Sequence, residues 1–377
     1  MISLLTQLFS IKKESMRAIR FHRVVQVIWL LPLFAFLLIT NNIALSLDWV
    51  LFPSFKKQEI KNPIFIASLP RTGTTNLFHS LSSNKSLFTA MSLWEIIFAP
   101  SITQKKMYRI LWSITPLTLK KRVEMVDQII FRKLNNIHRV SFFKKEEDEM
   151  IMMWALASVY MSFFYPESYV MRNLFRFDMG DISEKRKCRI IKIYYRMVQR
   201  HLYALGKGSS KQFLSKNPSM AARIETLATS FPDAKIIVIE RDPCNIFPST
   251  EALQKLLFNI ATDVPISSNE KKAIYKILED FRLNLQLTLV KKKTLPFKVV
   301  LFEDLINNKM VVINALLKWM NCSKMEIHNS GNTIHKTKAS YKPLEKKELA
   351  KILTKPWPEW PKKAYLITYD LKIKIHE

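Results

Sequence analysis

Apolar residues follow two different patterns along this chain. Residues 1–60 carry two long apolar runs, Val24–Thr40 and Ile43–Phe52, which are separated by Asn41-Asn42. From Asn62 onward the apolar runs are either short and bounded by turn-forming residues, or spaced like one face of a helix. The pattern predicts a hydrophobic N-terminal segment over residues 1–60 and a globular domain over residues 61–377.

The globular part alternates expected strands with expected helices. The strands are expected at Ile64–Leu69, Gln212–Leu214, Lys235–Ile239 and Phe297–Phe302. The helices are expected at Asn76–Ser82, Glu149–Phe164, Lys185–Leu205, Met220–Ser230, Lys271–Leu289 and Val311–Met320. This alternation is typical of an α/β protein with three layers, in which helices cover both faces of a central parallel sheet. A helix-rich insert at about residues 105–200, rich in Met, Phe, Trp and Tyr, is expected to form a lid.

The N-terminal segment is expected to associate with a membrane lipid surface. Val24–Thr40 is short for a span, because the hydrocarbon core of a bilayer needs about 20 helical residues. Basic residues lie on both sides of it: Lys12, Lys13, Arg17, Arg20, Arg23, Lys56, Lys57 and Lys61. A single span, a re-entrant hairpin turning at Asn41-Asn42 and an interfacial helix therefore all stay open. The remaining alternative is a pair of helices packed on the domain.

Composition excludes several classes of protein. The chain has 377 residues, of which 48% are hydrophobic and 11% aromatic, so general disorder is excluded. Its 3 cysteines are far apart, which excludes a disulfide scaffold and a zinc-finger grid. The 7 histidines show no metal-ligand spacing, and no metal is expected. The net charge of +28 favours anionic partners, but it is scattered, and we expect no nucleic acid.

The most informative stretch runs from Ile64 to Ser82. An apolar strand leads into Pro70-Arg71-Thr72-Gly73-Thr74-Thr75, and an amphipathic helix follows. Backbone N–H groups at such a helix start bind phosphate or sulfate groups, and Gly73 permits the close approach of the backbone. The threonines add hydroxyl donors and Arg71 adds a positive charge. The first glycine and the lysine of a Walker A loop are missing, which argues against a kinase.

Three further motifs lie at or near strand ends. Arg241-Asp242-Pro243 follows the strand Lys235–Glu240, and Ser249 lies on the next expected helix. A strand end and a following helix can converge on one dianion, which Arg241 and Ser249 would bind. The other two motifs are Phe213-Leu-Ser-Lys216-Asn-Pro218 and Leu301-Phe-Glu303-Asp304-Leu305.

Together these motifs resemble the sulfotransferase family, whose members use 3′-phosphoadenosine 5′-phosphosulfate (PAPS). The loop with arginine is similar to the bacterial and tyrosylprotein types, and the resemblance covers roughly Pro63 to Asn321. It implies a P-loop-like three-layer fold and transfer of a sulfuryl group from PAPS to a hydroxyl or amine. It also implies a set of cofactor-binding residues, namely Pro70, Arg71, Thr72, Gly73, Thr74, Thr75, Lys216, Arg241 and Ser249.

The same resemblance suggests catalytic roles. Sulfuryl transfer is an in-line displacement similar to phosphoryl transfer, and Arg71 lies where the family's catalytic cation lies. Three residues are candidates for the base that accepts the acceptor's proton. Glu95 ranks first, because the bacterial and tyrosylprotein types have a glutamate at about this place. Glu147 ranks second, from the cluster Glu146-Glu147-Asp148-Glu149, which could equally be the solvated start of a helix. His138 ranks third.

The sequence gives only a few indications of the acceptor substrate and of the cellular location. The apolar N-terminus and the aromatic insert suggest a small-molecule or lipid-like acceptor held at a membrane. The lysine- and asparagine-rich, glycine-poor composition resembles that of AT-rich bacterial genomes, so we expect the catalytic domain on the cytoplasmic side of a bacterial inner membrane. A Golgi-type lumenal enzyme is the alternative, which the sequons at Asn84 and Asn321 permit. The alternative functions are a P-loop-type kinase or nucleotide-dependent transferase, and a catalytically inactive sulfotransferase-like binding protein. The sequence indicates no particular oligomeric state.

Overall fold

A parallel sheet lies at the centre of the computed structural model, which describes residues 21–132, 140–163, 173–206, 210–262, 267–322 and 341–366. Its five strands follow the order β2-β3-β1-β4-β5, and every neighbouring pair is parallel. The strands are β1 (Ile64–Ile66), β2 (Phe88–Thr89), β3 (Gln212–Lys216), β4 (Lys235–Glu240) and β5 (Phe297–Leu301). The expected α/β fold with a central parallel sheet is confirmed.

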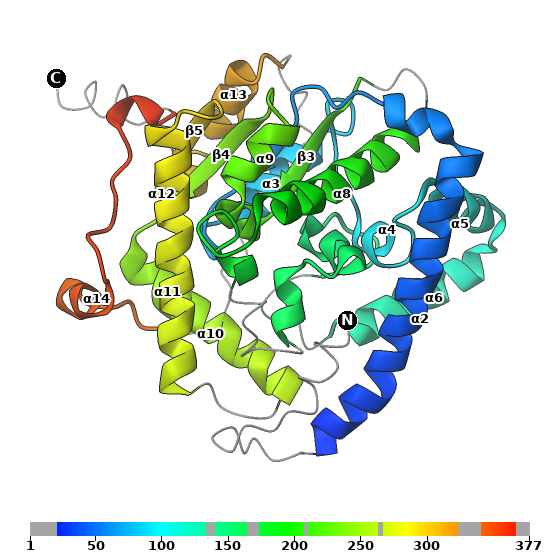
Figure 1. Ribbon diagram of the computed structural model, residues 1–377, viewed down its shortest axis with the longest axis horizontal. Coiled ribbons are helices and arrows are strands. Elements are labelled where there is room, and N and C mark those ends of the chain that lie inside the picture. The colour runs from blue at the N-terminus through cyan, green and yellow to red at the C-terminus, as the bar shows by residue number, and fades with distance from the viewer. Residues whose placement is uncertain are drawn as a thin grey trace.

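Helices surround this sheet (Figure 1). In chain order, the helical elements of the described residues are α2 (Phe21–Leu51), η1 (Pro53–Lys57), α3 (Thr74–Ser82), α4 (Leu93–Ile97), α5 (Ile102–Ile114), α6 (Leu117–Ile130), η3 (Asp148–Ala155), η4 (Val159–Phe163), α8 (Glu184–Tyr203), η5 (Pro218–Ala222), α9 (Ile224–Ser230), α10 (Pro243–Thr262), α11 (Ser268–Leu285), η6 (Gln286–Lys291), α12 (Phe302–Asn307), α13 (Lys309–Trp319), α14 (Lys346–Ile352) and η7 (Lys362–Ala364).

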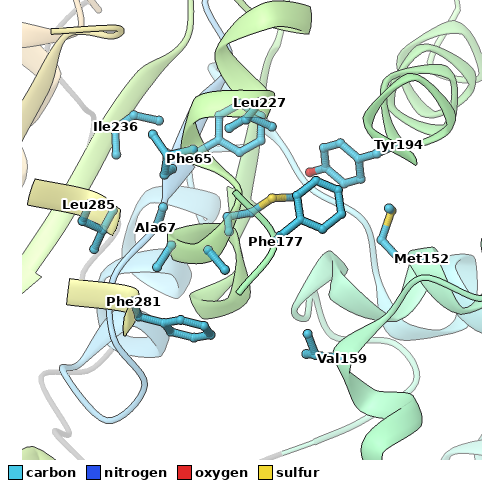
Figure 2. Close-up of a cluster of buried hydrophobic side chains, with 14 of the residues drawn as sticks. Phe65, Ala67, Met152, Val159, Phe177, Tyr194, Leu227, Ile236, Phe281 and Leu285 are labelled. Atoms are coloured by element: carbon cyan, nitrogen blue, oxygen red, sulfur yellow. The ribbon is translucent and has the colours of Figure 1, made fainter. Parts of the chain in front are cut away.

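Side chains of β1 alternate between two separate cores, one on each face of the sheet. Phe65 points into a core that it shares with Tyr194 of α8 and Phe281 of α11 (Figure 2). Its neighbours Ile64 and Ile66 point into the opposite core, which is formed with α3 and α13. Because both faces are covered, β1 is buried along its whole length. The three-layer arrangement fixes β1 as the central support for the loop that follows it.

The strand register brings three strand ends to one edge of the sheet. Ile66 of β1 pairs with Lys216 of β3 on one side and with Ile237 of β4 on the other. The carboxyl ends of parallel strands are where ligands bind in open α/β sheets. The loop after β1, Lys216 and Arg241 therefore lie at the same edge.

The continuous helix expected over Glu149–Phe164 is wrong. The structure has two short 3₁₀ helices instead, η3 and η4, and Leu156 between them adopts the left-handed region with φ of 52°. The Glu149 side chain accepts a hydrogen bond from the Val159 backbone N–H at 2.8 Å, which holds the folded-back chain. A polar contact across the break thus replaces the helical hydrogen bonds that the periodicity predicted.

The N-terminal apolar runs form one helix, α2, which passes through Asn41-Asn42 without a turn. The hairpin at that position is therefore not formed. Its stretch Leu31–Leu51 is the one candidate span among the described residues, with 21 residues, a mean hydropathy of 1.6 and 22% of it buried. The helix is thus long enough to cross a bilayer, yet part of one face is covered by the domain.

That covered face carries two fully buried polar residues. The Asn41 side chain donates to the Ile97 carbonyl at 2.9 Å and accepts from Gln104 Nε2 at 2.7 Å. Asp48 accepts from the backbone N–H of Ile102 at 2.9 Å, at the start of α5. It also pairs with buried Arg200 of α8 at 2.9 Å. These contacts fix the C-terminal half of α2 against the domain.

Candidate active site

The loop between β1 and α3 has the conformation that an anion-binding turn needs. Gly73 has φ of +90°, and a Cβ added there would lie 3.0 Å from Cδ2 of Phe302. Arg71 also adopts positive φ, 65°, which is unusual for a residue with a side chain. The buried Thr72 hydroxyl donates to the Leu69 carbonyl at 2.8 Å, so this side chain stabilises the turn itself. Thr74 and Thr75 begin α3, and Pro70 is half-buried at the exit of β1.

The two motifs read from the sequence meet at this loop. Arg71 Nε donates to Ser249 Oγ at 3.1 Å, and Ser249 is a buried residue of α10. Arg241 Nη1 donates to the Arg71 carbonyl at 2.7 Å, and its Nη2 donates to the Tyr341 hydroxyl at 2.7 Å. The Arg241 guanidinium lies over the Phe302 ring, 4.3 Å from its centroid. Segments far apart in sequence thus place two guanidinium groups side by side.

These groups create a positively charged site. Burial, followed by the neighbouring charge of Arg241, lowers the pKa of Arg71. Among the described residues, the Arg241 guanidinium hydrogen-bonds to a carbonyl and a hydroxyl and pairs with no carboxylate. Two close like charges are relieved by an anion, and guanidinium groups match the geometry of phosphate and sulfate. The donor set therefore fits a ligand with phosphate or sulfate groups.

Lys216 connects the loop to the acidic cluster. Its side chain is fully buried at the end of β3, and its Nζ donates to Thr75 Oγ1 at 3.2 Å. The same Nζ lies 3.0 Å from Glu147 Oε1 and 4.0 Å from Glu146 Oε2. A carboxylate of the cluster is thereby placed next to the first turn of α3.

The members of the acidic cluster have separate environments. Asp148 accepts from the Tyr194 hydroxyl at 2.6 Å, and burial raises the pKa of Asp148 to about 6. Glu149 forms a bidentate pair with fully buried Arg223, with distances of 2.7 and 3.0 Å. Glu147 keeps 23% of its side chain exposed. The hydroxyl of Tyr160 donates to Glu147 as well.

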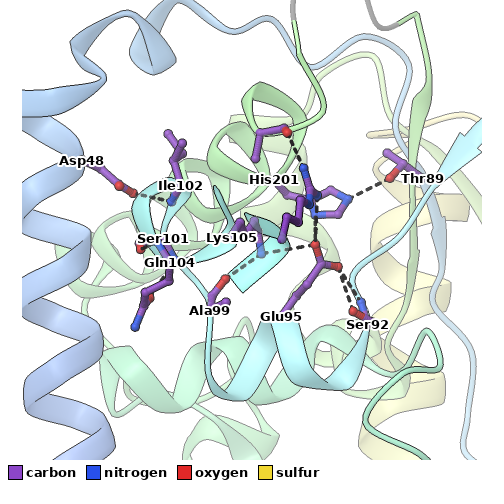
Figure 3. Close-up of polar contacts among 12 residues, drawn as sticks. Asp48, Thr89, Ser92, Glu95, Ala99, Ser101, Ile102, Gln104, Lys105 and His201 are labelled. Atoms are coloured by element: carbon purple, nitrogen blue, oxygen red, sulfur yellow. Dashed lines mark hydrogen bonds and ion pairs between the residues drawn. The ribbon is translucent and has the colours of Figure 1, made fainter. Parts of the chain in front are cut away.

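Glu95 lies in a different, buried network (Figure 3). It is the third residue of α4, and its Oε2 accepts from the backbone N–H and the hydroxyl of Ser92, both at 3.0 Å. Its Oε1 lies 3.7 Å from Nζ of fully buried Lys105 and 3.9 Å from Nδ1 of His201. The carboxylate therefore caps a helix and neutralises a buried cation.

The charge state of this network is fixed over a wide pH range. Burial raises the pKa of Glu95, but Lys105, His201 and the Ser92 hydrogen bonds outweigh it and bring the value to about 2. Burial and the nearby lysines lower the pKa of His201 to about 3, although Glu95 acts in the opposite direction. A general base works best when its pKa lies near the operating pH, and Glu95 is far from that condition.

The structure thus separates the residues that the sequence proposed for one site. It brings together Arg71, Gly73, Thr74, Thr75, Lys216, Arg241, Ser249 and Glu147. Glu95 contacts the other network, and His138 lies outside the described residues. Within the described ranges, no group of three or more His, Cys, Asp or Glu residues is placed to hold a metal ion.

Sequence reasoning missed three side chains of this site. Phe302 stood in a quoted motif, but no role was assigned to its ring. Tyr160 and Tyr341 carried no local signal, because each meets its partner only through the tertiary fold. The capping box Ser92-x-x-Glu95 was a readable signal for a structural role of Glu95.

Comparisons with known proteins agree with this geometry. A model of the "Sulfotransferase family" matches residues 63–326. Omega-hydroxy-beta-dihydromenaquinone-9 sulfotransferase Stf3 of Mycobacterium bovis and Mycobacterium tuberculosis is 29% identical over 136 residues, which are 34% of this chain. The match spans 32% of the length of Stf3, about a third of that protein.

Two crystal structures share the fold. Sulfotransferase STF1 from Mycobacterium tuberculosis superposes with a TM-score of 0.60 at 17% identity, covering 77% of this chain and 75% of the other. Sulfotransferase STF9 from Mycobacterium avium also gives 0.60 at 17% identity, covering 75% and 69%. Since the family model covers most of the chain and the fold agrees with solved members, this protein is an enzyme of the sulfotransferase family.

Proposed function

We propose that the enzyme transfers a sulfuryl group from PAPS to a hydroxyl or amine of a membrane-borne, lipid-like acceptor by in-line displacement. The observation that carries this proposal is the convergence of Arg71, Arg241 and Ser249 on the loop after β1. Bound PAPS would supply the activated sulfuryl group. The protein would bind it, orient it, stabilise the leaving oxygen and accept the acceptor's proton.

The donor set divides into two anion sites. The backbone N–H groups at the start of α3, with Thr75 and Lys216, would bind the 5′-phosphosulfate. Arg241 and Ser249 would bind the 3′-phosphate, because a strand end and the next helix meet there. Arg71 belongs to the loop before α3 and contacts Ser249 through its Nε, and it would donate to the leaving oxygen, where negative charge grows.

Glu147 is our proposed base, in place of the first-ranked Glu95. It lies 3.0 Å from Lys216, which itself contacts Thr75 of the loop, and it remains partly exposed. An acceptor can therefore approach Glu147, whereas Glu95 is enclosed among Ser92, Lys105 and His201. Tyr160 would orient the Glu147 carboxylate through its hydroxyl.

The acceptor class rests on two supports. Stf3, which matches about a third of this chain, is a sulfotransferase of omega-hydroxy-beta-dihydromenaquinone-9, a hydroxyl compound. The second support is the apolar helix α2 beside the domain. We propose a lipid-like alcohol as acceptor and a location on the cytoplasmic side of a bacterial membrane.

Calorimetric titration with 3′-phosphoadenosine 5′-phosphate tests the donor site. We expect micromolar affinity, about −8 kcal/mol, and a loss of about 2 to 5 kcal/mol in Arg241→Ala. Lys235→Ala is a matched control, because it removes one positive charge from the other end of the same strand. Equal affinity for adenosine 5′-phosphate in the unchanged protein would contradict the assignment.

Transfer of labelled sulfate tests the acceptor. The enzyme and labelled PAPS are incubated with the organic and the aqueous fraction of a bacterial membrane extract, and the labelled product is separated. Label in a lipid-soluble product supports a lipid-like acceptor. Label confined to a water-soluble product contradicts that part of the proposal and leaves the donor site intact.

A further inference from the structure

Helices α5 and α6 expose an unusual amount of apolar surface. Nearly every residue from Lys106 to Ile130 is exposed, and Asp127 is the buried exception. The exposed apolar side chains include Ile110, Ile114, Leu117, Met125, Ile129 and Ile130. Soluble monomers rarely expose contiguous apolar patches larger than a few hundred Å², and larger ones mark interaction sites. We call this pair of helices the α5–α6 arm.

The outer face of α2 exposes a second apolar stripe on the same side of the molecule. Its members recur at helical spacing and include Leu33, Phe36, Ile39, Ile43, Leu47 and Val50. Helix α5 contacts α2, and Figure 1 shows α2, α5 and α6 together, away from the sheet. The exposed stripe of α2 and the exposed apolar residues of the α5–α6 arm thus lie on neighbouring helices, and we call them together the apolar side.

The charges and aromatic rings of the apolar side match an anionic bilayer. Lys106, Lys121 and Arg122 are exposed on the arm, and Glu124 is its one exposed acidic residue. Trp112 on α5 and Trp49 on α2 are partly exposed among these apolar residues. Basic residues beside an apolar face, with tryptophan at the level of the lipid headgroups, are typical of helices that lie in the membrane interface.

The buried face of α2 argues against a helix that crosses the bilayer along Leu31–Leu51. Asp48 binds the start of α5 and Arg200, and Asn41 binds Gln104. Placing residues 41–51 in the hydrocarbon core would either carry these polar partners with them or break the contacts, and both are costly in lipid. An orientation with α2 parallel to the membrane keeps every one of these contacts.

We propose that the apolar side is a monotopic membrane-binding surface for anionic phospholipid, in which the α5–α6 arm contacts the bilayer together with α2. The arm is connected to the candidate active site. The buried Asp127 carboxylate of α6 accepts a hydrogen bond from the Phe142 N–H at 2.7 Å. Glu147 follows Phe142 five residues later in the sequence. The surface would hold the partly exposed carboxylate of Glu147 near the membrane.

Vesicle flotation of the full-length protein tests the arm. The vesicles contain phosphatidylcholine with phosphatidylglycerol. Ile114→Asp should lower the partition coefficient about tenfold, since it places a charge where an apolar side chain is 72% exposed. Val311→Asp on α13, where the side chain is 49% exposed, is the matched control and should bind like the unchanged protein. Circular dichroism melting checks that both variants fold.

A second experiment measures tryptophan fluorescence, and its result does not require a variant that has lost membrane binding. Brominated phosphatidylcholine should quench the emission of Trp112, and Trp112→Phe should remove a part of the quenching that Trp319→Phe retains. In sealed vesicles with the domain outside, external protease should cleave both an N-terminal tag and the domain. Protection of the tag alone would show that α2 crosses the bilayer, and would overturn the monotopic arrangement.

Two other outcomes would also overturn the proposal. If Ile114→Asp and Val311→Asp float equally well, the arm does not contact the membrane. If the protein forms a dimer in sedimentation without lipid, and Ile114→Asp dissociates it without changing flotation, the apolar side binds a second copy of the chain. These measurements need no sulfuryl transfer, so they stand apart from the tests of the proposed activity.

Discussion

Glu95 and Glu147 are the two glutamates that the sequence ranks first and second as the base, and the fold places them in opposite environments. Glu95 is enclosed by a helix cap, a buried lysine and a histidine. Glu147 is partly exposed, between Lys216 and Tyr160. The comparison teaches that distance along the chain from a phosphate-binding loop is a poor guide to catalytic function. The partners of the carboxylate decide whether it stabilises the fold or faces a substrate.

The strongest test of this comparison is turnover in Glu147→Gln. The amide cannot accept the proton of the acceptor, so single-turnover sulfuryl transfer should fall about 10² to 10⁴-fold. Affinity for 3′-phosphoadenosine 5′-phosphate should stay within a few-fold. Full activity in this variant would remove Glu147 from the mechanism.

Glu95→Gln should have the opposite effect to Glu147→Gln. The protein should lose stability, while turnover per folded molecule should change little. The change in pKa from 4.5 to about 2 corresponds to about 3 kcal/mol of folding free energy. The variant would also leave the buried Lys105 without its carboxylate. Urea unfolding at neutral pH measures the loss, and an unchanged midpoint with a large fall in turnover would restore Glu95 as the base.

Acid should destabilise the protein in two separable steps. In the unfolded chain His201 takes up a proton below pH 6.5, whereas in the folded protein it stays neutral down to about pH 3. The stability of the folded protein therefore falls as the pH decreases. Protonation of Glu95 likewise lowers the stability as the pH falls from 4.5 to about 2. His201→Gln should flatten the slope of unfolding free energy between pH 6.5 and 4.5, by at most about 1.4 kcal/mol per pH unit. Glu95→Gln lowers the stability at neutral pH but should change its slope against pH only below pH 4.5. A wild-type slope in His201→Gln would contradict the assignment.

The smallest expected effect is at Tyr160. Tyr160→Phe removes the hydroxyl that donates to Glu147 and should lower turnover about tenfold, in line with one hydrogen bond to a charged group. Unchanged single-turnover transfer in Tyr160→Phe would contradict the orienting role of this hydroxyl.

The meeting of the proposed phosphate-binding residues at one edge of the sheet could be predicted from the sequence, because it depends on fold topology. Strands at Ile64, Gln212 and Lys235 form parallel neighbours, so the residues that follow them share one edge. The sequence therefore predicted that Arg71 and Arg241 lie close together, and they are in contact in the structure. Gly73 was recognised in the same way, since a strand–glycine–helix turn is a local signal.

Other features, which local pattern did not reveal, depend on partners that are distant in sequence. The predicted helix over Glu149–Phe164 is broken where the Glu149 carboxylate accepts from the Val159 N–H. The same carboxylate pairs with Arg223, a distant residue that hydrophobic periodicity does not take into account. The first rank given to Glu95 overlooked His201, more than a hundred residues away. Buried polar pairs of this kind are specified by the packing of whole helices rather than by local pattern.

The contacts of Asp48 have a practical consequence for producing this protein. An apolar N-terminal helix is commonly trimmed from an enzyme before purification, but a cut after α2 would leave Arg200 buried without its carboxylate and the first N–H groups of α5 without Asp48 as their acceptor. Loss of one partner of a buried ion pair costs about 3 to 5 kcal/mol, which is a large part of a domain's stability. Solubility should instead be engineered on the exposed apolar stripe of α2, at positions such as Phe36 and Ile43, while Asn41 and Asp48 are retained.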